Sequence, residues 1–255
     1  MGINRDSEQY SGLVAWWPSL ASGGGRDTRL VDVVGPGTMS QSGAPVLGRG
    51  DSILGPNVAI GTGNYLTGSD ANLPSGSSAR TIAQWFKLDA IPSVDQYTFT
   101  YGSLVATQWF TMGIYGGAGG NQWIVSNAAA AGVSSGYTVA AGSIYHVVFT
   151  NSVALGSAFY VNGVPVTLSG VPATFNTVLS SVSFSNYQAL SASVFESRVY
   201  SRVLSAAEVG RLYDHRTRFD LYRLPSRFAR KSGSAGGVTR FRRTAFLRAG
   251  SRGFA

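Results

Sequence analysis

The chain of 255 residues contains no cysteine. Disulfides, thiolate metal sites and cysteine nucleophiles are therefore excluded together, and stability has to come from packing. Charged residues are sparse, at 13%, and no apolar run approaches the roughly 18 residues of a membrane span. The N-terminal stretch, MGINRDSEQY, carries charges and lacks the apolar core of a signal peptide. We expect a soluble protein made without a leader.

Small and aromatic residues dominate where charge is missing. Glycine accounts for 33 residues, and aromatic side chains make up 12% of the chain. Such a mixture is typical of many short strands joined by tight turns. Because sandwiches of this length are commonly single units, we expect one large all-β domain with a full core and no long helix.

The stretch from Val194 to Tyr213, VFESRVYSRVLSAAEVGRLY, changes its period half-way. Its first half alternates with the two-residue period of a half-buried strand. We expect Phe195 and Val199 on one face of that strand. The polar side chains of Glu196 and Arg198 are expected on the other face.

The second half of the stretch predicts a short capped helix. Ser205 stands three residues before Glu208, so the hydroxyl and the carboxylate can each reach the other's free backbone N–H. Leu204 is placed to pack on Val209 as a hydrophobic staple. The leucine and tyrosine that end the stretch continue the apolar stripe from Val209, which would lie back on a sheet.

Short strands with turn signals between them are predicted along the rest of the chain. They cover residues 12–20, 80–88, 97–101, 109–115, 122–126, 143–152, 158–166 and 182–184. The pair Asn162-Gly163 is the strongest hairpin signal, because both residue types accept a positive φ. Pro165 lacks an N–H and is expected at a sheet edge.

The strand, the Leu-Ser-X-X-Glu link and the helix ending in Leu-Tyr resemble the C-terminal signature of the laminin-G-like, concanavalin A-like jelly-roll family. Further similarities are GLVAWWPSL from Gly12, RTIAQWFKL from Arg80, SIYHVVFTNS from Ser143 and AFYVNGVPV from Ala158. The resemblance implies an all-β fold, an antiparallel two-sheet jelly-roll sandwich with one short C-terminal helix.

Three segments are expected along the chain: an N-terminal segment (1–11), a laminin-G-like domain (12–216) and an extended basic C-terminal arm (217–255). From Arg211 onward the sequence holds twelve Arg or Lys against two Asp, a net charge of +10. Residues 1–210 are left with a net charge of −2. The basic charge therefore belongs to the end of the chain.

No catalytic site is expected. The family's fold also hosts glycosidases, which work through two carboxylates about 5 to 9 Å apart. Glu196 and Glu208 are the only two glutamates after the first ten residues, and Glu208 is engaged as a helix cap. His146 is interpreted as a satisfied sheet residue, and His215 complements the carbonyl end of the helix. We predict that the protein is not an enzyme.

Two kinds of binding site follow from the resemblance. Members of the family sometimes bind calcium through loop carboxylates, and Asp70 with Asn72 is the local pair that suggests such a site. No other cofactor or metal is expected. A glycan would bind through a loop rim or through an exposed aromatic side chain such as Trp109 or Trp123, which can stack on sugar rings.

The arm alternates arginine with aromatic and aliphatic residues. The side chains predicted to bind a partner are Arg223, Arg227, Phe228, Arg230, Arg240, Phe241, Arg242, Arg243, Phe246 and Leu247. An acidic protein surface would pair with the arginines and accept the aromatic rings in its grooves. Nucleic acid is ranked lower, and no membrane is expected because the arginines do not share one side of a helical wheel. The composition also fits a disordered solubilising extension.

The segment from Asp220 to Arg230 gives a second resemblance, to a type of laminin-G-like protein found in the virions of tailed bacteriophages. The leading hypothesis is a non-enzymatic virion structural protein, a capsid decoration or cement protein assembled in the host cytoplasm. Its basic arm would bind the major capsid protein or another virion protein, within a homo-oligomer or symmetric assembly. The alternative is a carbohydrate-binding module of a tail fibre or tail tip that attaches to surface glycans of the host.

Overall fold

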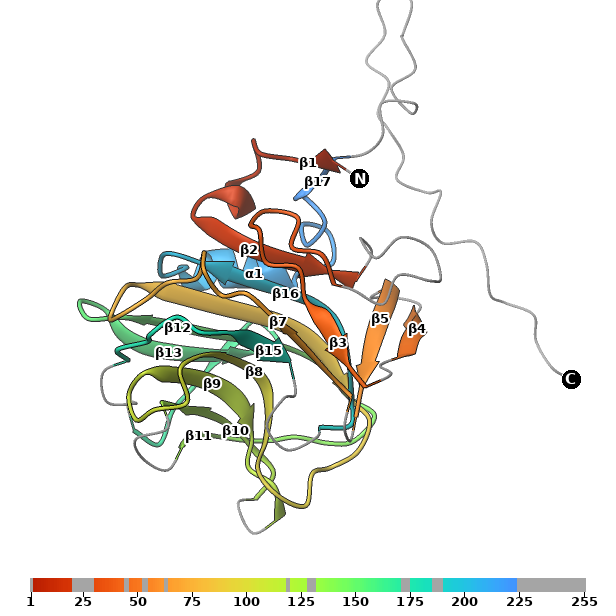
Figure 1. The fold of residues 1–255 in the computed structure, drawn as a ribbon, viewed down its shortest axis with the longest axis vertical. Coiled ribbons are helices and arrows are strands. Elements are labelled where there is room, and N and C mark those ends of the chain that lie inside the picture. The colour runs from red at the N-terminus through yellow and green to blue at the C-terminus, as the bar shows by residue number, and fades with distance from the viewer. Residues whose placement is uncertain are drawn as a thin grey trace, which may run out of the picture. The chain divides into compact units, whose positions relative to one another are not determined.

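A computed structural model describes residues 2–19, 30–43, 46–51, 55–61, 64–117, 120–127, 132–170, 175–184 and 190–223. They belong to the first of two units, Met1–Arg223, which we call the body; the second unit, Leu224–Ala255, lies outside the described residues. Two large antiparallel sheets, a separate two-stranded sheet, a short 3-10 helix and one α-helix form the described body (Figure 1). The predicted all-β sandwich with a short C-terminal helix is confirmed.

One sheet has seven strands, in the order β11, β10, β9, β8, β15, β6 and β3. In that order their bounds are Val133–Thr138, Gln122–Ser126, Trp109–Ile114, Gln96–Gly102, Val182–Phe184, Tyr65–Gly68 and Ser40–Ser42. Every neighbouring pair is antiparallel.

The other sheet has eight strands, in the order β14, β13, β12, β7, β16, β5 and β4, with β2 also paired to β16. Their bounds are Val164–Val166, Gly156–Val161, Ile144–Ser152, Arg80–Leu88, Ala192–Tyr200, Gly55–Ile60, Val46–Asp51 and, for β2, Leu13–Pro18. Asn162 and Gly163 both have positive φ in the turn between β13 and β14, which confirms the predicted hairpin. Pro165 lies on the edge strand β14, as expected.

Strands β7 and β16 form the centre of the eight-stranded sheet. One edge of β16 pairs with β7. On its other edge, residues 192–194 pair with β5 and residues 196–200 pair with β2. Figure 1 shows β2 and β16, from opposite ends of the body's sequence, side by side. Every residue of β7 except Lys87 is buried, so this strand, predicted at residues 80–88, is covered on both faces.

The main core lies between the two sheets. It contains large apolar side chains from both layers, including Phe86, Phe149, Phe99, Phe110 and Trp123. Their rings make tilted and edge-to-face contacts, for example between Phe86 and Trp123 at 4.9 Å. Burial of this apolar surface is the main favourable term in the stability of the sandwich.

A second apolar cluster lies on the outer face of the eight-stranded sheet. It joins Trp16 of β2, Val148 of β12 and Tyr200 of β16 to Val209 and Leu212 of helix α1 (Ala206–Tyr213). The helix therefore covers this face, as its apolar stripe predicted. The opposite side chains of the sheet point into the main core.

The cap of α1 forms as the sequence predicted. The Ser205 side chain accepts the Glu208 backbone N–H, and the Glu208 carboxylate accepts the Ser205 backbone N–H at 2.8 Å. Arg202 donates to the same carboxylate at 2.6 Å. That hydrogen bond, with the cap, lowers the pKa of Glu208 to about 2. Leu204 and Val209 share the outer apolar cluster, which confirms the staple.

The strand prediction for residues 194–200 was wrong at one position. Val199 points into the main core, whereas Phe195 packs against Trp85 on the outer face. A bulge between Val194 and Glu196, opposite β7, places one extra residue in β16 and reverses the alternation there. The uninterrupted period of two in the sequence gave no sign of this bulge.

The two ends of the body meet on its outer face. Strand β1 (Gly2–Ile3) pairs with β17 (Tyr222–Arg223), and both Arg218 and Leu221 are buried. The expected boundary between domain and arm, after residue 216, is therefore corrected: residues 217–223 belong to the body, because they pack on it and pair with its first strand.

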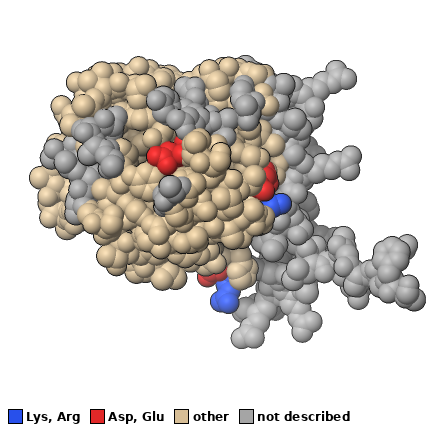
Figure 2. Space-filling model, turned by 90° about the horizontal axis from the view of Figure 1, so that it is seen from below, with Lys and Arg blue, Asp and Glu red and all other residues tan. Residues whose placement is uncertain are grey.

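Charged side chains are unevenly distributed over the body. Figure 2 views the molecule from the side on which β10 and β11 lie in Figure 1, and few described Lys, Arg, Asp or Glu residues appear there. The ion pairs of the described residues involve instead Glu196, Glu8 of the 3-10 helix η1 (Glu8–Tyr10), helix α1 and the segment that follows it. The α1 side is where charged groups gather.

Candidate functional site

Three charged side chains form a buried ion cluster beneath the segment that follows α1. Glu196 and Arg198 come from β16, and Arg218 comes from the returning chain. Arg198 Nε donates to Glu196 Oε1 at 2.6 Å, and Arg218 Nε donates to Glu196 Oε2 at 3.3 Å. The Trp16 indole N–H donates to Glu196 Oε1 at 2.6 Å. One carboxylate is thus shared by two guanidinium groups.

The surrounding chain holds the cluster in place. Arg198 also donates to Gln9 Oε1 at 2.7 Å and to the Arg218 backbone carbonyl at 2.9 Å. Burial alone would lower the pKa of Arg198, but the attraction and hydrogen bond to Glu196, together with Tyr200 and Tyr222, raise the pKa above its usual value. Burial lowers the pKa of Arg218, and the repulsion from Arg198 lowers it further. The attraction to Glu196 raises the pKa but does not restore its usual value. Glu196 therefore compensates the buried positive charge of Arg198 more fully than that of Arg218.

An aromatic stack adjoins the cluster. Tyr213, the last residue of α1, lies parallel to the Trp85 indole, with ring centroids 5.6 Å apart and an interplanar angle of 8°. His146 contacts both rings, at 4.8 Å from Trp85 and 6.0 Å from Tyr213. The Arg218 guanidinium carbon lies 4.5 Å from the centre of the Trp85 ring, within the range of a cation–π contact. The stack and the ion cluster form one continuous structure.

His146 is held neutral in this environment. Burial lowers its pKa well below the usual 6.5, and the positive charges of Arg198 and Arg218 lower it further. Its backbone N–H donates to Asn162 Oδ1 at 2.9 Å, while its buried Nδ1 has no hydrogen-bond partner among the described residues. The prediction of a satisfied sheet residue was therefore wrong for the imidazole.

A surface hollow of about 710 Å³ opens where α1 and the following segment leave the sheet uncovered. We call it the α1 hollow. It is lined by Trp85, Ile144, Asn162, Tyr213, Asp214, His215, Arg216, Arg218 and Phe219. The size falls within the roughly 300 to 1,000 Å³ of small-ligand sites. Tyr213 is 40% exposed and Phe219 is 38% exposed, so two aromatic rings are available to a ligand there.

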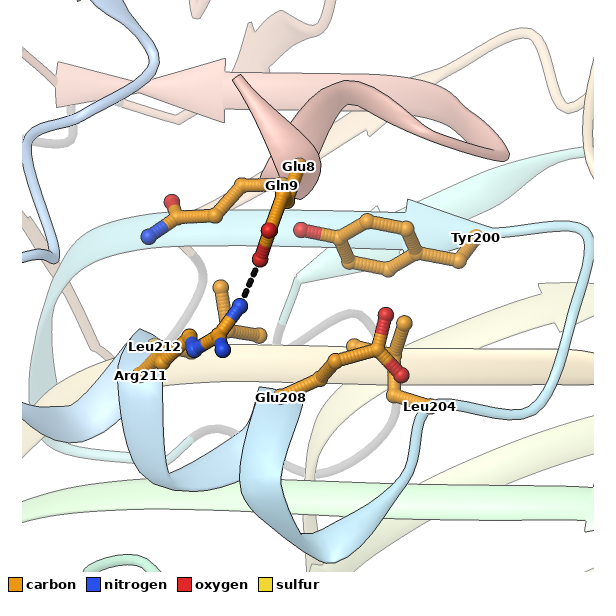
Figure 3. Close-up of a pocket in the computed structure, with 7 residues that line it drawn as sticks. All are labelled: Glu8, Gln9, Tyr200, Leu204, Glu208, Arg211 and Leu212. Atoms are coloured by element: carbon orange, nitrogen blue, oxygen red, sulfur yellow. Dashed lines mark ion pairs between the residues drawn. The ribbon is translucent and has the colours of Figure 1, made fainter.

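The N-terminal segment braces the other side of the helix. Figure 3 shows Glu8 of η1 in an ion pair with Arg211 of α1, beside Tyr200 and Glu208. The small space between these residues is about 10 Å³, room for about one water molecule. This contact closes one flank of α1, and it leaves the α1 hollow as the larger opening beside the helix.

The two tryptophans predicted to stack on sugars do not offer their rings. Trp123 is fully buried in the main core, so that prediction was wrong. Trp109 is 8% exposed and packs edge-to-face on Tyr97 at 5.4 Å, which leaves little ring surface. Successive side chains of a strand point to opposite faces of the sheet, so the position of a tryptophan within its strand decides which face its ring covers. Both rings pack against other side chains of the fold.

The pair suggested for calcium is used in hydrogen bonds. Asp70 is buried, and its Oδ2 accepts the Ser180 backbone N–H at 2.8 Å. Asn72 Nδ2 donates to the Val14 carbonyl and approaches Asp32 Oδ2 at 3.4 Å. Within the described ranges no three His, Asp or Glu residues gather as metal ligands would. The residues present do not match a calcium site of several carboxylates.

The structure describes one of the residues named in the predicted partner-binding arm. Nine of its ten named residues, from Arg227 to Leu247, lie outside the described residues. Arg223 is described only through its backbone, which pairs with Gly2 in the β1–β17 ladder. Within the described part of the chain, no helix is long and apolar enough to cross a membrane.

No arrangement for nucleophilic catalysis is found among the described residues. Residues 132–136 read Gly-Val-Ser-Ser-Gly, which matches the hydrolase elbow pattern. Ser134, however, lies in strand β11 and bonds to the Gln122 side chain, where a nucleophile would need a strand-to-helix turn. His215 is exposed beside Asp214 and forms no such pair with a serine. The buried His146 ring packs against the aromatic rings of Trp85 and Tyr213.

Comparison with known families identifies the class of protein. A laminin G family model, described as the concanavalin A-like lectin/glucanases superfamily, matches residues 60–210. The match covers more than half of the chain, so the protein belongs to this family. A comparison with curated protein sequences finds no match.

Solved structures share the fold at low sequence identity. Trypanosoma rangeli sialidase in complex with the inhibitor DANA aligns with a TM-score of 0.59 and 18% identity over 79% of this chain and 32% of the sialidase. Domain 4 of an extracellular arabinanase from Geobacillus stearothermophilus, in complex with arabinotriose, aligns with a TM-score of 0.57 and 18% identity over 79% of this chain and 98% of the domain. A botulinum neurotoxin type C structure aligns with a TM-score of 0.61 and 13% identity over 80% of this chain and 51% of the toxin chain. The chain thus spans about a third of the sialidase and half of the toxin chain.

Proposed function

We propose that this protein binds carbohydrate in the α1 hollow and does not cleave it. The observation that carries the proposal is an exposed Tyr213 ring held parallel to the buried Trp85 indole at the wall of the hollow. An aromatic face fixed in this way can stack on the apolar C–H face of a sugar ring, with little entropy to lose on binding.

Polar groups beside the ring suit the hydroxyls of a sugar. Asn162, Asp214 and Arg216 line the same hollow. Asn162 is fixed through its hydrogen bond with the backbone of β12, and Asp214 accepts the Arg216 backbone N–H at 2.9 Å. A mostly apolar concave site with a few oriented polar groups is the usual form of a small-ligand site.

Cleavage is not proposed, because the carboxylates are not arranged for it. Glycoside hydrolysis generally takes two carboxyl groups on either side of the scissile bond. Among the described lining residues, Asp214 is the carboxylate that faces the hollow. The nearby Glu196 is buried and bound by two arginines and an indole, so it is not available as an acid or nucleophile.

Related structures support a carbohydrate ligand without identifying it. The arabinanase domain was solved with arabinotriose, and the structure of the neurotoxin is described by the interaction of the toxin with two ganglioside molecules. Both share the sandwich with this chain at identities where only the fold is comparable. The assignment to the α1 hollow therefore depends on the residues of this chain.

A glycan array followed by calorimetry tests the proposal. Tyr213→Leu keeps an apolar side chain on Trp85 but removes the ring, and it should weaken binding of the array's best ligand by roughly tenfold or more. Tyr213→Phe should retain binding. Leu155→Ala removes a side chain that is 75% exposed in the turn after β12, and should have no effect. Absence of any glycan signal at micromolar protein, or equal binding by Tyr213→Leu, would refute the proposal.

A second function, attachment to an acidic surface in a virion, is favoured by the charge distribution. Residues 224–255 hold eight of the chain's 20 Lys and Arg and none of its 12 Asp and Glu, so the first 223 residues carry 12 of each. We propose that the body is neutral and that the C-terminal arm supplies the electrostatic attachment to a capsid or other virion protein.

Truncation after Arg223 tests this second function. The cut preserves the β1–β17 pair, whereas a cut at residue 216 would remove Arg218 and Leu221 from the body. The shortened protein should unfold at the same urea concentration as the full chain but fail to co-sediment with virus particles. Undiminished co-sedimentation would show that the arm is not the attachment element.

A further inference from the structure

The ion cluster beneath the α1 hollow has an excess of positive charge. Glu196 is one carboxylate, and Arg198 and Arg218 are two guanidinium groups, each 3% exposed or less. At the wall of the hollow, Asp214 and Arg216 add one charge of each sign. The described groups around this site therefore total three guanidinium groups against two carboxylates.

The remaining neighbours do not supply the missing negative charge. Burial raises the pKa values of Tyr200 and Tyr222, so both phenols stay neutral at physiological pH. His146 is neutral and could only add positive charge. An uncompensated buried charge is costly, because it has lost water without gaining a full partner. An anion bound at this site would recover part of that cost.

Arg218 is the member of the cluster that reaches the hollow. Its guanidinium lies over the Trp85 ring, and Arg218 is one of the residues that line the hollow. Arg198 does not line the hollow and is bonded to Glu196 and Gln9. The single hydrogen bond from Arg218 to Glu196 is long, at 3.3 Å, compared with 2.6 Å from Arg198. The excess charge is therefore located on Arg218, at the side of the hollow.

We infer that the saccharide of the α1 hollow is acidic, and that its carboxylate binds Arg218 while its ring stacks on Tyr213. The inference rests on the proposed function and specifies its ligand class, which includes sugars of the uronic or sialic acid kind. A planar guanidinium matches a planar carboxylate through paired hydrogen bonds, which favours a carboxylate over the tetrahedral sulfate ester. Arg216, exposed at the rim, would add attraction for the same charge.

Calorimetry with matched ligands tests the inference on the full chain. The probes are 3′-sialyllactose and a glucuronic-acid-ended disaccharide, each beside its carboxyl methyl ester, and lactose 3′-sulfate. At least one acid should bind roughly tenfold or more tightly than its ester, because the ester keeps the ring but loses the charge-assisted hydrogen bonds. Equal affinities of acid and ester, or tighter binding of the sulfate than of both acids, would overturn the inference.

Arg218→Gln provides the matched variant. It removes the excess charge but leaves Glu196 balanced by Arg198, so the ion cluster is not left with an unpaired charge. The variant should bind the ester as the natural chain does and lose the preference for the acid. Arg5→Gln changes net charge equally at an exposed site, and should keep the preference. If Arg218→Gln did not fold, the acid and ester affinities of the natural chain would still decide.

The outcomes separate this inference from the proposed function. Binding of neutral glycans that depends on Tyr213, with acid and ester equal, would retain the carbohydrate site and reject its acidic ligand. Failure of every probe, together with an array without signal, would reject the site itself. A preference for acid that survives in Arg218→Gln would reject Arg218 as the group that binds the carboxylate.

Discussion

Strand β7 buries side chains on both faces of the eight-stranded sheet, and the two faces differ in their chemistry. Towards the other sheet it presents Ile82 and Phe86, which join a core of aliphatic and aromatic side chains. On the outer face it presents Trp85, which contacts His146 and a guanidinium group. The inner face also holds Arg80, which is fully buried and hydrogen-bonded to Tyr101 and Thr177 at 2.6 Å, so the inner face is mainly apolar whereas the outer face carries paired charges.

The difference shows what each face contributes. The inner face is stabilised by removal of apolar surface from water, which needs no particular partner and tolerates small changes of shape. The outer face depends on specific partners, since a buried charge is costly unless an opposite charge pairs with it. A fold that needed only stability would have little use for such a face. We interpret it as the part of the body that is specialised for binding.

Removal of the Glu196 carboxylate should have the largest effect on stability. Glu196→Ala would leave Arg198 and Arg218 buried side by side without an anion, and we expect the free energy of unfolding to fall by about 3–5 kcal/mol. Urea denaturation followed by tryptophan fluorescence measures this change. A loss below about 1 kcal/mol would mean that the outer face does not depend on its ion cluster, and would remove the contrast with the core.

A matched comparison sharpens this prediction. Arg218→Gln leaves the Glu196–Arg198 pair intact, so it should cost clearly less than Glu196→Ala. Ile82→Val, on the inner face of the same sheet, should cost about 0.5–1.5 kcal/mol through loss of one buried methylene. If Arg218→Gln destabilised the protein as much as Glu196→Ala, the charge excess argued for Arg218 would be wrong.

Mild acid should weaken the outer face before it affects the core. The pKa of His146 in the folded protein lies well below its unfolded value of about 6.5, so the folded state binds fewer protons. Its contribution to stability is complete above pH 6.5 and is lost as the pH falls, at about 1.4 kcal/mol per pH unit. The carboxylate of Glu208 loses its own contribution only below about pH 4.5, so pH 6.5 to 5 reports mainly on His146.

The measurement is the urea midpoint between pH 7.5 and pH 5, with His146→Phe as the control. Phenylalanine keeps a ring against Trp85 and Tyr213 but cannot take up a proton. The natural chain should lose stability towards pH 5, and the variant should lose much less. Parallel pH profiles for the two proteins would contradict a buried neutral histidine.

Loss of the helix cap should have an intermediate effect. Ser205→Ala removes the hydroxyl that accepts the Glu208 backbone N–H, and such a change costs about 1 kcal/mol. Thermal unfolding measures it. Because α1 carries Tyr213 into the hollow, glycan affinity should fall slightly with it, whereas Ser205→Asp should restore both. A large loss of affinity with unchanged stability would mean that the cap acts on the site directly.

Elements of the fold that depend on local signals could be predicted from the sequence. The capping box at Ser205, the Asn162-Gly163 turn and the buried strand β7 each follow from residues close together in the chain. The bulge at Phe195 could not be predicted, because it is set by pairing with β7 across the sheet. Short strands such as β11, whose sequence VSSGYT has few β-branched residues, were also missed.

The candidate site was largely missed because its residues come together only in three dimensions. Trp85 lies within a predicted strand, but the sequence does not say which of the alternating side chains of β7 point to the core and which, like Trp85, point outward. Arg218 was assigned to the arm because arginine alternates there with aromatic and aliphatic residues, although Leu221, three residues later, packs on the body. Exposed tryptophans were sought instead, and a large aromatic ring in a strand is more often part of the core.

The exposed ion pair between Glu8 and Arg211 should contribute the least. Their side chains are 74% and 51% exposed, so water screens the attraction and each side chain loses entropy when it is held. We expect Arg211→Gln to change the free energy of unfolding by less than about 0.5 kcal/mol, and 1 M NaCl to abolish even that difference. Gln9, which bonds Arg198 from the same short helix, should matter more, since it satisfies a buried charge. If Arg211→Gln proved more destabilising than Gln9→Ala, the N-terminal segment would be held by its surface and not by the ion cluster.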